Sequence, residues 1–169
     1  MTLADVLISE FDHEMGTTRK LLEVVPEDQA AWKPHPKSFT LGELGLHLAN
    51  LPTWAVMTAQ DTEFDMNPPN GSPPERPTFR SPAATLQYFD DNIQKARAAI
   101  ASLSDADMMV PWTFKNAGQT VFSMPRAAVL RSFVMNHIIH HRGQLTVYLR
   151  QCDVPLPSVY GPTADGGGM

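Results

Sequence analysis

Apolar residues recur with a helical period over most of the chain, and prolines mark where the helices end. Between Thr2 and Val25 the apolar positions are three or four residues apart, and Pro26 follows. This spacing predicts a first helix, for which Thr2 and Asp5 form a capping pair. Its expected inward stripe consists of Leu3, Val6, Leu7, Phe11, Met15 and Leu22.

A second helix is predicted from Thr40 to about Gln60. Thr40 and Glu43 form a T-x-x-E capping box ahead of a regular apolar pattern, and His47 falls on the inward side of that pattern. Pro52 lies inside this range and removes one backbone hydrogen bond. We therefore expect a kink near Leu48.

A third helix is predicted to begin at Ser81-Pro82 and to end near Leu103. The segment before it, residues 61–80, contains five prolines and has no helical period. Because it joins the second and third predicted helices, we expect a long crossover connection. A loop of this length within one domain usually covers a site or is mobile. Residues 104–122 form a second irregular connection, with a short hairpin expected over 113–122 around Ala117-Gly118.

The fourth predicted helix runs from Ser123, its expected N-cap, to Cys152, with Pro125 in the first turn. One face of this helix carries Leu130, Val134, His137, His141, Gln144 and Tyr148. A second apolar stripe consists of Met135, Ile138, Ile139, Leu145 and Leu149. A helix that is apolar on most sides lies at the centre of a domain or at a subunit interface, so this stripe favours a homodimer.

Four helices and two long connections predict an all-α fold, a four-helix bundle with at least one crossover connection. We expect a single domain over residues 1–162. Residues 163–169 end in three glycines and a methionine and are predicted to form a flexible C-terminal tail.

Composition narrows the classes of partner. The chain has 169 residues, 43% of them hydrophobic, which is enough for one buried core. Its net charge is −5 and only 18% of residues are charged, which argues against nucleic-acid binding. No secretion signal and no stretch of about 20 apolar residues is present, so we expect a cytoplasmic protein that does not span a membrane. Cys152, the single cysteine, has no partner for an internal disulfide.

The candidate chemistry lies in three histidines. His137 and His141 are four residues apart, so on a helix they project from the same side, about 6 Å apart. His47 on a facing helix would complete three nitrogen ligands and leave positions open for water or substrate. Nitrogen ligands suit Zn or Ni, with Fe, Co, Cu or Mn as further candidates, and disfavour Mg and Ca. The alternative is a buried polar pair that is hydrogen-bonded within the core.

Two further residues of the same stripe are candidate catalytic groups. Gln144 lies one turn beyond the histidine pair and could orient a metal-bound water or a substrate. Tyr148 could donate a hydrogen bond, or it could be a core aromatic residue whose hydroxyl is already bonded. His140 lies about 100° around the helix from His141, beside the site or toward a partner subunit. The H-E-x-x-H motif is absent, because Ile138 stands where the glutamate would be.

Two blocks of the sequence resemble the DinB family, which includes the YfiT-like proteins. They are NHIIHHRGQLTVYLRQCDVPLPSVYGP at 136–162 and WKPHPKSFTLGELGLHLANL at 32–51. The resemblance implies an up-up-down-down four-helix bundle, often a homodimer, and a divalent metal held by three histidines, here His47, His137 and His141. Relatives in the wider superfamily include thiol-dependent S-transferases, so the resemblance implies a low-molecular-weight thiol as a possible cosubstrate.

Two functions from different classes follow. The first is a metal-dependent enzyme that activates a thiol, as an S-transferase, or water, as a hydrolase, for attack on a small-molecule substrate. Residues 61–80 and 153–162 could then cover the site. The alternative is a non-catalytic metal-binding protein acting in stress response or metal handling. A helical dimer with histidines in its core and no metal is the third interpretation.

Overall fold

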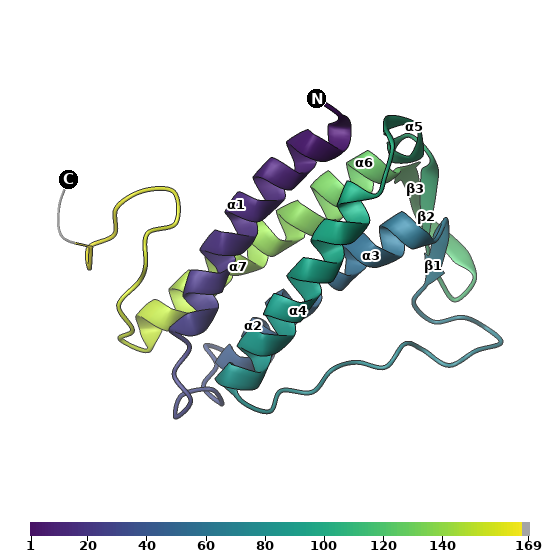
Figure 1. The fold of residues 1–169 in the computed structure, drawn as a ribbon. Helices are drawn as coiled ribbons and strands as arrows, with labels where there is room; N and C mark the ends of the chain where they lie inside the picture. The colour runs from purple at the N-terminus through teal and green to yellow at the C-terminus, as the bar shows by residue number, and fades with distance from the viewer. Residues whose placement is uncertain (167–169) are drawn as a thin grey trace.

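Residues 1–166 are described by the computed structural model, and most of them are helical (Figure 1). The long helices pack side by side, and a small sheet lies at one end. The helical segments are α1 (Leu3–Glu23), α2 (Leu41–Asn50), α3 (Thr53–Gln60), α4 (Pro82–Ala101), α5 (Asp105–Met108), α6 (Arg126–Ala128), the π-helical η1 (Val129–Met135) and α7 (Asn136–Gln151). The strands are β1 (Glu63–Asp65), β2 (Pro111–Asn116) and β3 (Gln119–Pro125). Part of the predicted flexible tail, residues 167–169, lies outside the described residues.

The helices begin where local chemistry favours them. Thr2 and Thr40 each accept a hydrogen bond from the third residue of the following helix, and the Asp5 and Glu43 carboxylates bond back to the capping backbone. These reciprocal bonds satisfy two free N–H groups at each helix start. Ser81 caps α4 in a similar way through one side-chain bond, with a proline at the first helical position. The predicted starts of these three helices are confirmed.

Two ion pairs show the relative direction of α1 and the last helical segment, because later residues of α1 pair with later residues of that segment. Glu10 pairs with Arg131 in η1, and Glu14 pairs with Arg142 in α7. The two segments are therefore parallel. Between α1 and α4 the order is reversed, since Arg97, late in α4, pairs with a residue early in α1. The α4 helix is thus antiparallel to α1, and α2 and α3 run in the same direction as α4 (Figure 1).

These directions correct the expected up-up-down-down order. The first and last helical segments run one way, and the segments between them run the other way. The reason lies in the connections. Residues 24–40 turn the chain straight back after α1, whereas the connection between α3 and α4 returns the chain along the molecule to the end where α2 began (Figure 1). One crossover is sufficient for this arrangement.

The expectation of an all-α fold is confirmed in part: the chain is mostly helical, but it also forms a three-stranded sheet in the order β1-β2-β3. Strand β1 pairs in parallel with β2, and β2 pairs antiparallel with β3. The hairpin is longer than predicted, and its turn is where the sequence places it. Both Ala117 and Gly118 have positive φ, 51° and 75°. Positive φ at both central residues is the arrangement of a type I′ turn, which matches the twist of paired strands.

The start of the fourth helix was predicted too early. Ser123 lies in β3, opposite Thr113, and its hydroxyl is 2.9 Å from the Thr113 hydroxyl. It is therefore a strand residue and not an N-cap. Helical structure begins at Arg126, whose guanidinium donates to the carbonyls of Thr58, at 2.8 Å, and Asp61, at 3.0 Å. This buried arginine ties the helix start to the C-terminal end of α3.

The second predicted helix is broken rather than kinked. The α2 helix ends at Asn50, and α3 begins after Pro52. Pro52 has no N–H to donate to the carbonyl of Leu48, so the backbone tightens, and Trp54 donates to the carbonyl of Leu51 three residues back. The α2 helix therefore ends two residues beyond Leu48, where the kink is predicted.

The expected inward stripe of the first helix is wrong at two positions. Leu3 and Val6 of α1 are 42% and 52% exposed, although both were expected to face inward. Four of the five residues of the second stripe of the last helix are buried within the chain itself, and Ile139 is half-buried. Met135, Ile138, Leu145 and Leu149 are at most 2% exposed. Because these side chains already pack in the protein's own core, this stripe gives no support for a homodimer.

Candidate metal centre

The three predicted histidines come together between α2 and α7. His47 lies in the last turn of α2, and His137 and His141 occupy successive turns of α7. One ring nitrogen from each can be chosen so that all three lie within 4.8 Å of one another, and all three side chains are half-buried. Among the His, Cys, Asp and Glu side chains of the described residues, these three histidines are the group that lies close enough together to share a metal ion.

The ring positions show how close this approach is. The Nε2 atoms of His137 and His141 are 3.0 Å apart. The ring of His47 lies 5.3 Å from that of His137 and 4.5 Å from that of His141, centre to centre, and is nearly perpendicular to the latter. Two nitrogens bound to one ion at about 2.1 Å lie at most about 4.2 Å apart. Small side-chain rotations would therefore suffice to bring all three to one ion.

The protonation state also suits metal binding. Burial, and to a smaller extent the neighbouring histidines, lower the pKa of His47 and of His137 to about 4. Burial lowers the pKa of His141 as well. All three imidazoles are therefore neutral at pH 7 and keep a free lone pair. The residues present fit a nitrogen-ligated divalent metal by number, spacing and charge state.

Gln144 adjoins the centre through His141 and bridges it to His140. Its Oε1 lies 2.7 Å from His141 Nδ1, and its Nε2 lies 3.2 Å from His140 Nε2. An amide oxygen only accepts, so His141 donates from Nδ1 and keeps its Nε2 lone pair free on the side of His137. This is the arrangement by which outer residues orient a ligating histidine. His140 is exposed and accepts from the amide.

Tyr148, the other candidate catalytic group, lies two turns beyond His141. Its ring packs edge-on against Trp32, with the centroids 5.6 Å apart. It is half-buried beside the core. This position matches the core-aromatic alternative more closely than a role at the three histidines.

Aromatic rings border the histidines on two sides. Phe39 stacks on His47 at 5.5 Å with an interplanar angle of 29°. Phe133, one turn before His137, lies 5.9 Å from it. Neither residue was singled out from the sequence. The spacing of Phe133 and His137, four residues apart on one helix, is the pattern that would have indicated their contact.

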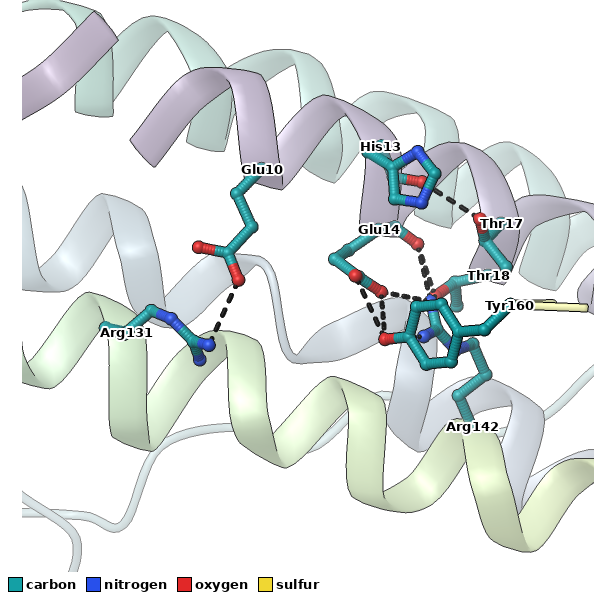
Figure 2. Close-up of polar contacts among 8 residues, drawn as sticks. All are labelled: Glu10, His13, Glu14, Thr17, Thr18, Arg131, Arg142 and Tyr160. Atoms are coloured by element: carbon teal, nitrogen blue, oxygen red, sulfur yellow. Dashed lines mark hydrogen bonds and ion pairs between the residues drawn. The ribbon is translucent and has the colours of Figure 1, made fainter. Parts of the chain in front are cut away.

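A buried ion pair fixes α7 against α1 on the side away from the histidines. Arg142 follows His141 directly, and its Nη1 lies 2.6 Å from Glu14 Oε2. The same Nη1 donates to the Glu14 carbonyl at 3.1 Å. Figure 2 shows Tyr160, from the C-terminal segment, pointing into this pair. Its hydroxyl donates to the Glu14 carboxylate at about 2.9–3.0 Å and accepts from Arg142 Nη2 at 2.6 Å.

Sequence reasoning missed this pair, although a pattern could have indicated it. Arg142 falls in the apolar stripe between Ile138 and Leu145, and Glu14 falls between Phe11 and Thr18 on the inward side of α1. Opposite charges inside two apolar stripes favour a buried pair.

The two segments expected to cover the site contact other parts of the chain. Tyr160 of the 153–162 segment reaches the α1–α7 interface. In the crossover connection, Phe79 packs so closely on Gly42 that a Cβ there would lie 2.8 Å from its ring. The connection, α2 and α4 line an open pocket of about 440 Å³. Its lining includes Arg76 and Arg80 but none of the three histidines.

No helix among the described residues has the length and apolarity needed to cross a membrane. The structure thus defines a mostly helical protein with three neutral histidines gathered between two helices. The sequence profile of the DinB superfamily matches residues 10–145. The chain belongs to the DinB superfamily.

Individual relatives agree with this assignment. An uncharacterized protein of Bacillus subtilis strain 168, YrdA, is 24% identical over 171 residues, covering 95% of this chain and 90% of its own. The crystal structure of a DinB-like protein from Bacillus cereus ATCC 10987 is similar with a TM-score of 0.70 and 22% identity, over 91% of this chain and 95% of that one. The DinB-like protein YjoA of B. subtilis gives 0.68 and 21%, over 90% and 96%. At these identities the two crystal structures support the fold.

Proposed function

We propose that this protein binds one divalent transition metal ion, Zn or Ni in the first instance, through His47, His137 and His141, and uses it in catalysis. The observation that carries the proposal is the convergence of three neutral imidazoles from two helices. A direct hydrogen bond between His137 and His141 is the competing explanation of their contact. It does not account for the third neutral ring of His47 beside them.

The histidines and Gln144 would have separate roles at the metal centre. The three imidazoles hold the ion, and Gln144 holds His141 in the tautomer whose Nε2 is free. When bound, such an ion is a Lewis acid that lowers the pKa of a thiol or water that reaches it. Because all three ligands are neutral, none of the ion's charge is cancelled by its ligands.

A thiol fits the surroundings better than water. The hydrogen bonds and ion pairs described for the three histidines include no carboxylate, so no carboxylate is placed to act as a general base. A thiol with an ordinary pKa near about 8.5 needs little help to ionise beside a cation. Water, whose pKa is far higher than that of a thiol, needs far more. We therefore place a low-molecular-weight thiol before water as the nucleophile, and a small-molecule electrophile as its partner.

Metal content is the first test. Protein purified without a His tag should carry about one ion per chain by elemental analysis, and His47→Ala and His141→Ala should each lose it. His13→Ala, which changes an exposed histidine of α1, is the matched control and should retain it. No ion in the wild-type protein, even after reloading with Zn, Ni and Fe, would contradict the proposal.

Turnover is the second test. Metal-loaded protein is assayed with thiols and electrophiles and, separately, with a panel of hydrolase substrates. Activity that disappears in His141→Ala supports the enzyme. A stoichiometric ion without turnover in either panel would instead support a non-catalytic metal-binding protein.

We also propose a homodimer, on the grounds of apolar side chains that remain exposed. Leu3 and Val6 on α1 and Val147 on α7 are 42%, 52% and 57% exposed. Sedimentation should give twice the chain mass of 18.7 kDa. A single species at the chain mass would contradict this part of the proposal.

A further inference from the structure

A group of aromatic side chains continues from the histidines toward the sheet. Phe133 of η1 lies beside His137 and contacts Trp54 of α3, with ring centroids 5.0 Å apart. Phe114 of β2 and Phe122 of β3 lie 5.7 and 5.2 Å from the Phe133 ring. We call Trp54, Phe114, Phe122 and Phe133 the aromatic wall. It draws on four elements that meet at one end of the site.

The aromatic wall is not fully covered by the protein. All four of its side chains are half-buried, whereas Trp112, the next aromatic residue of the sheet, is fully buried. A cluster that served packing alone would be expected to lie in the core as Trp112 does. The π-helical turn of η1 carries Phe133, and such turns occur often at functional sites.

A further aromatic ring lies against His47. Phe39 is 47% exposed and lies nearly parallel to the His47 ring. Phe39 therefore lies against His47, and Phe133 lies against His137. No Lys, Arg, Asp or Glu takes part in their hydrogen bonds within residues 1–166. The side chains bonded to the histidines thus offer a substrate no counter-charge beyond the ion itself, whereas a flat apolar group finds two aromatic faces.

We propose that the electrophilic substrate of this centre carries an aromatic or flat apolar group, and that Phe133 and Phe39 select it. The inference rests on the proposed metal function and adds the substrate class. Aromatic contacts of this kind change affinity by about tenfold, which corresponds to about 1.4 kcal/mol.

The test uses two metal-directed probes that differ by one ring. Cobalt(II)-loaded protein is titrated with acetohydroxamate and with benzohydroxamate, and binding is followed by the visible spectrum of the cobalt. We expect benzohydroxamate to bind about tenfold more tightly to the wild type. Phe133→Leu and Phe39→Leu, which keep apolar volume but remove the ring, should each reduce this preference. They should leave the cobalt spectrum and the acetohydroxamate affinity unchanged.

Phe79→Leu is the matched control, because Phe79 is a half-buried aromatic residue that packs on Gly42 in the crossover connection. It should keep the full preference. Equal binding of the two probes by the wild type, or a preference that survives in both Phe133→Leu and Phe39→Leu, would overturn the inference and leave the metal site standing. Failure of the wild type to bind cobalt would overturn the proposed function and the inference together.

Discussion

The buried pair of Glu14 and Arg142 provides the sharpest prediction about stability. Their side chains are only 7% and 2% exposed, and their closest atoms are 2.6 Å apart. Arg142→Met keeps most of the apolar volume but removes the charge. The Glu14 carboxylate then stays buried with the Tyr160 hydroxyl as its remaining side-chain partner.

The size of the effect follows from the burial. Removing one member of a buried ion pair costs about 3–5 kcal/mol, because the other charge remains without compensation. For a domain of this size each kcal/mol lowers Tm by about 2–4 °C. We therefore expect Arg142→Met to lower Tm by about 6–20 °C. The double variant Glu14→Leu with Arg142→Met leaves no buried charge and should recover most of this loss.

The assay is urea unfolding of metal-free protein, analysed as a double-mutant cycle over the two positions. Arg150→Met is the control, because Arg150 pairs with Asp165 where the side chains are 45% and 26% exposed. A surface pair of this kind is worth less than about 1 kcal/mol. If Arg142→Met is no more destabilising than Arg150→Met, or if the double variant loses the sum of the two single losses, the reasoning about burial is refuted.

Three further outcomes are expected. Chelation with EDTA should lower the Tm of the wild type by about 5–11 °C, since a ligand at a hundredfold excess over Kd adds about 2.7 kcal/mol; His141→Ala should show no such shift. Burial holds the pKa of His137 at about 4, below its ordinary value of 6.5. The unfolded chain therefore binds more protons between these pH values, and the unfolding free energy of the metal-free protein should fall as the pH is lowered from 6.5 to 4. For this half-buried ring the contribution is about 1–2 kcal/mol, and urea titrations of His137→Gln should show a correspondingly smaller fall. Ala117→Asn should raise Tm by about 1–3 °C, because Asn tolerates the positive φ of 51° at that turn position better than Ala does; an unchanged or lower Tm would contradict this.

Local chemistry accounts for what the sequence predicted correctly. The capping residues Thr2, Thr40 and Ser81 act within one turn of their own helices, so their effect does not depend on the rest of the fold. The same holds for the turn at Ala117-Gly118. The i, i+4 spacing of His137 and His141 fixes their proximity as soon as the segment is helical.

The errors arose where a short segment suits two conformations. The local pattern of residues 119–125 suits both a hairpin strand and a helix start, because Ser123 with a proline two residues later resembles an N-cap. In the fold, Phe122 and Met124 turn the same way and the strand continues to Pro125. Pairing with β2 across the hairpin turn decided between the two conformations, and the capping pattern at Ser123 contains no information about that partner strand.

The sequence by itself therefore determined the helices, the candidate ligands and the family. Only the tertiary structure decided the direction of each helix, the approach of His47 to the other two histidines, and the pairing of Glu14 with Arg142. The two side-chain contacts join residues that are 90 or more positions apart in the chain. Periodicity reports which face of a helix is apolar, but it contains no information about which other helix covers that face. The polar residues within such a face are paired only when the helices pack, because burial is what makes an unpaired charge costly.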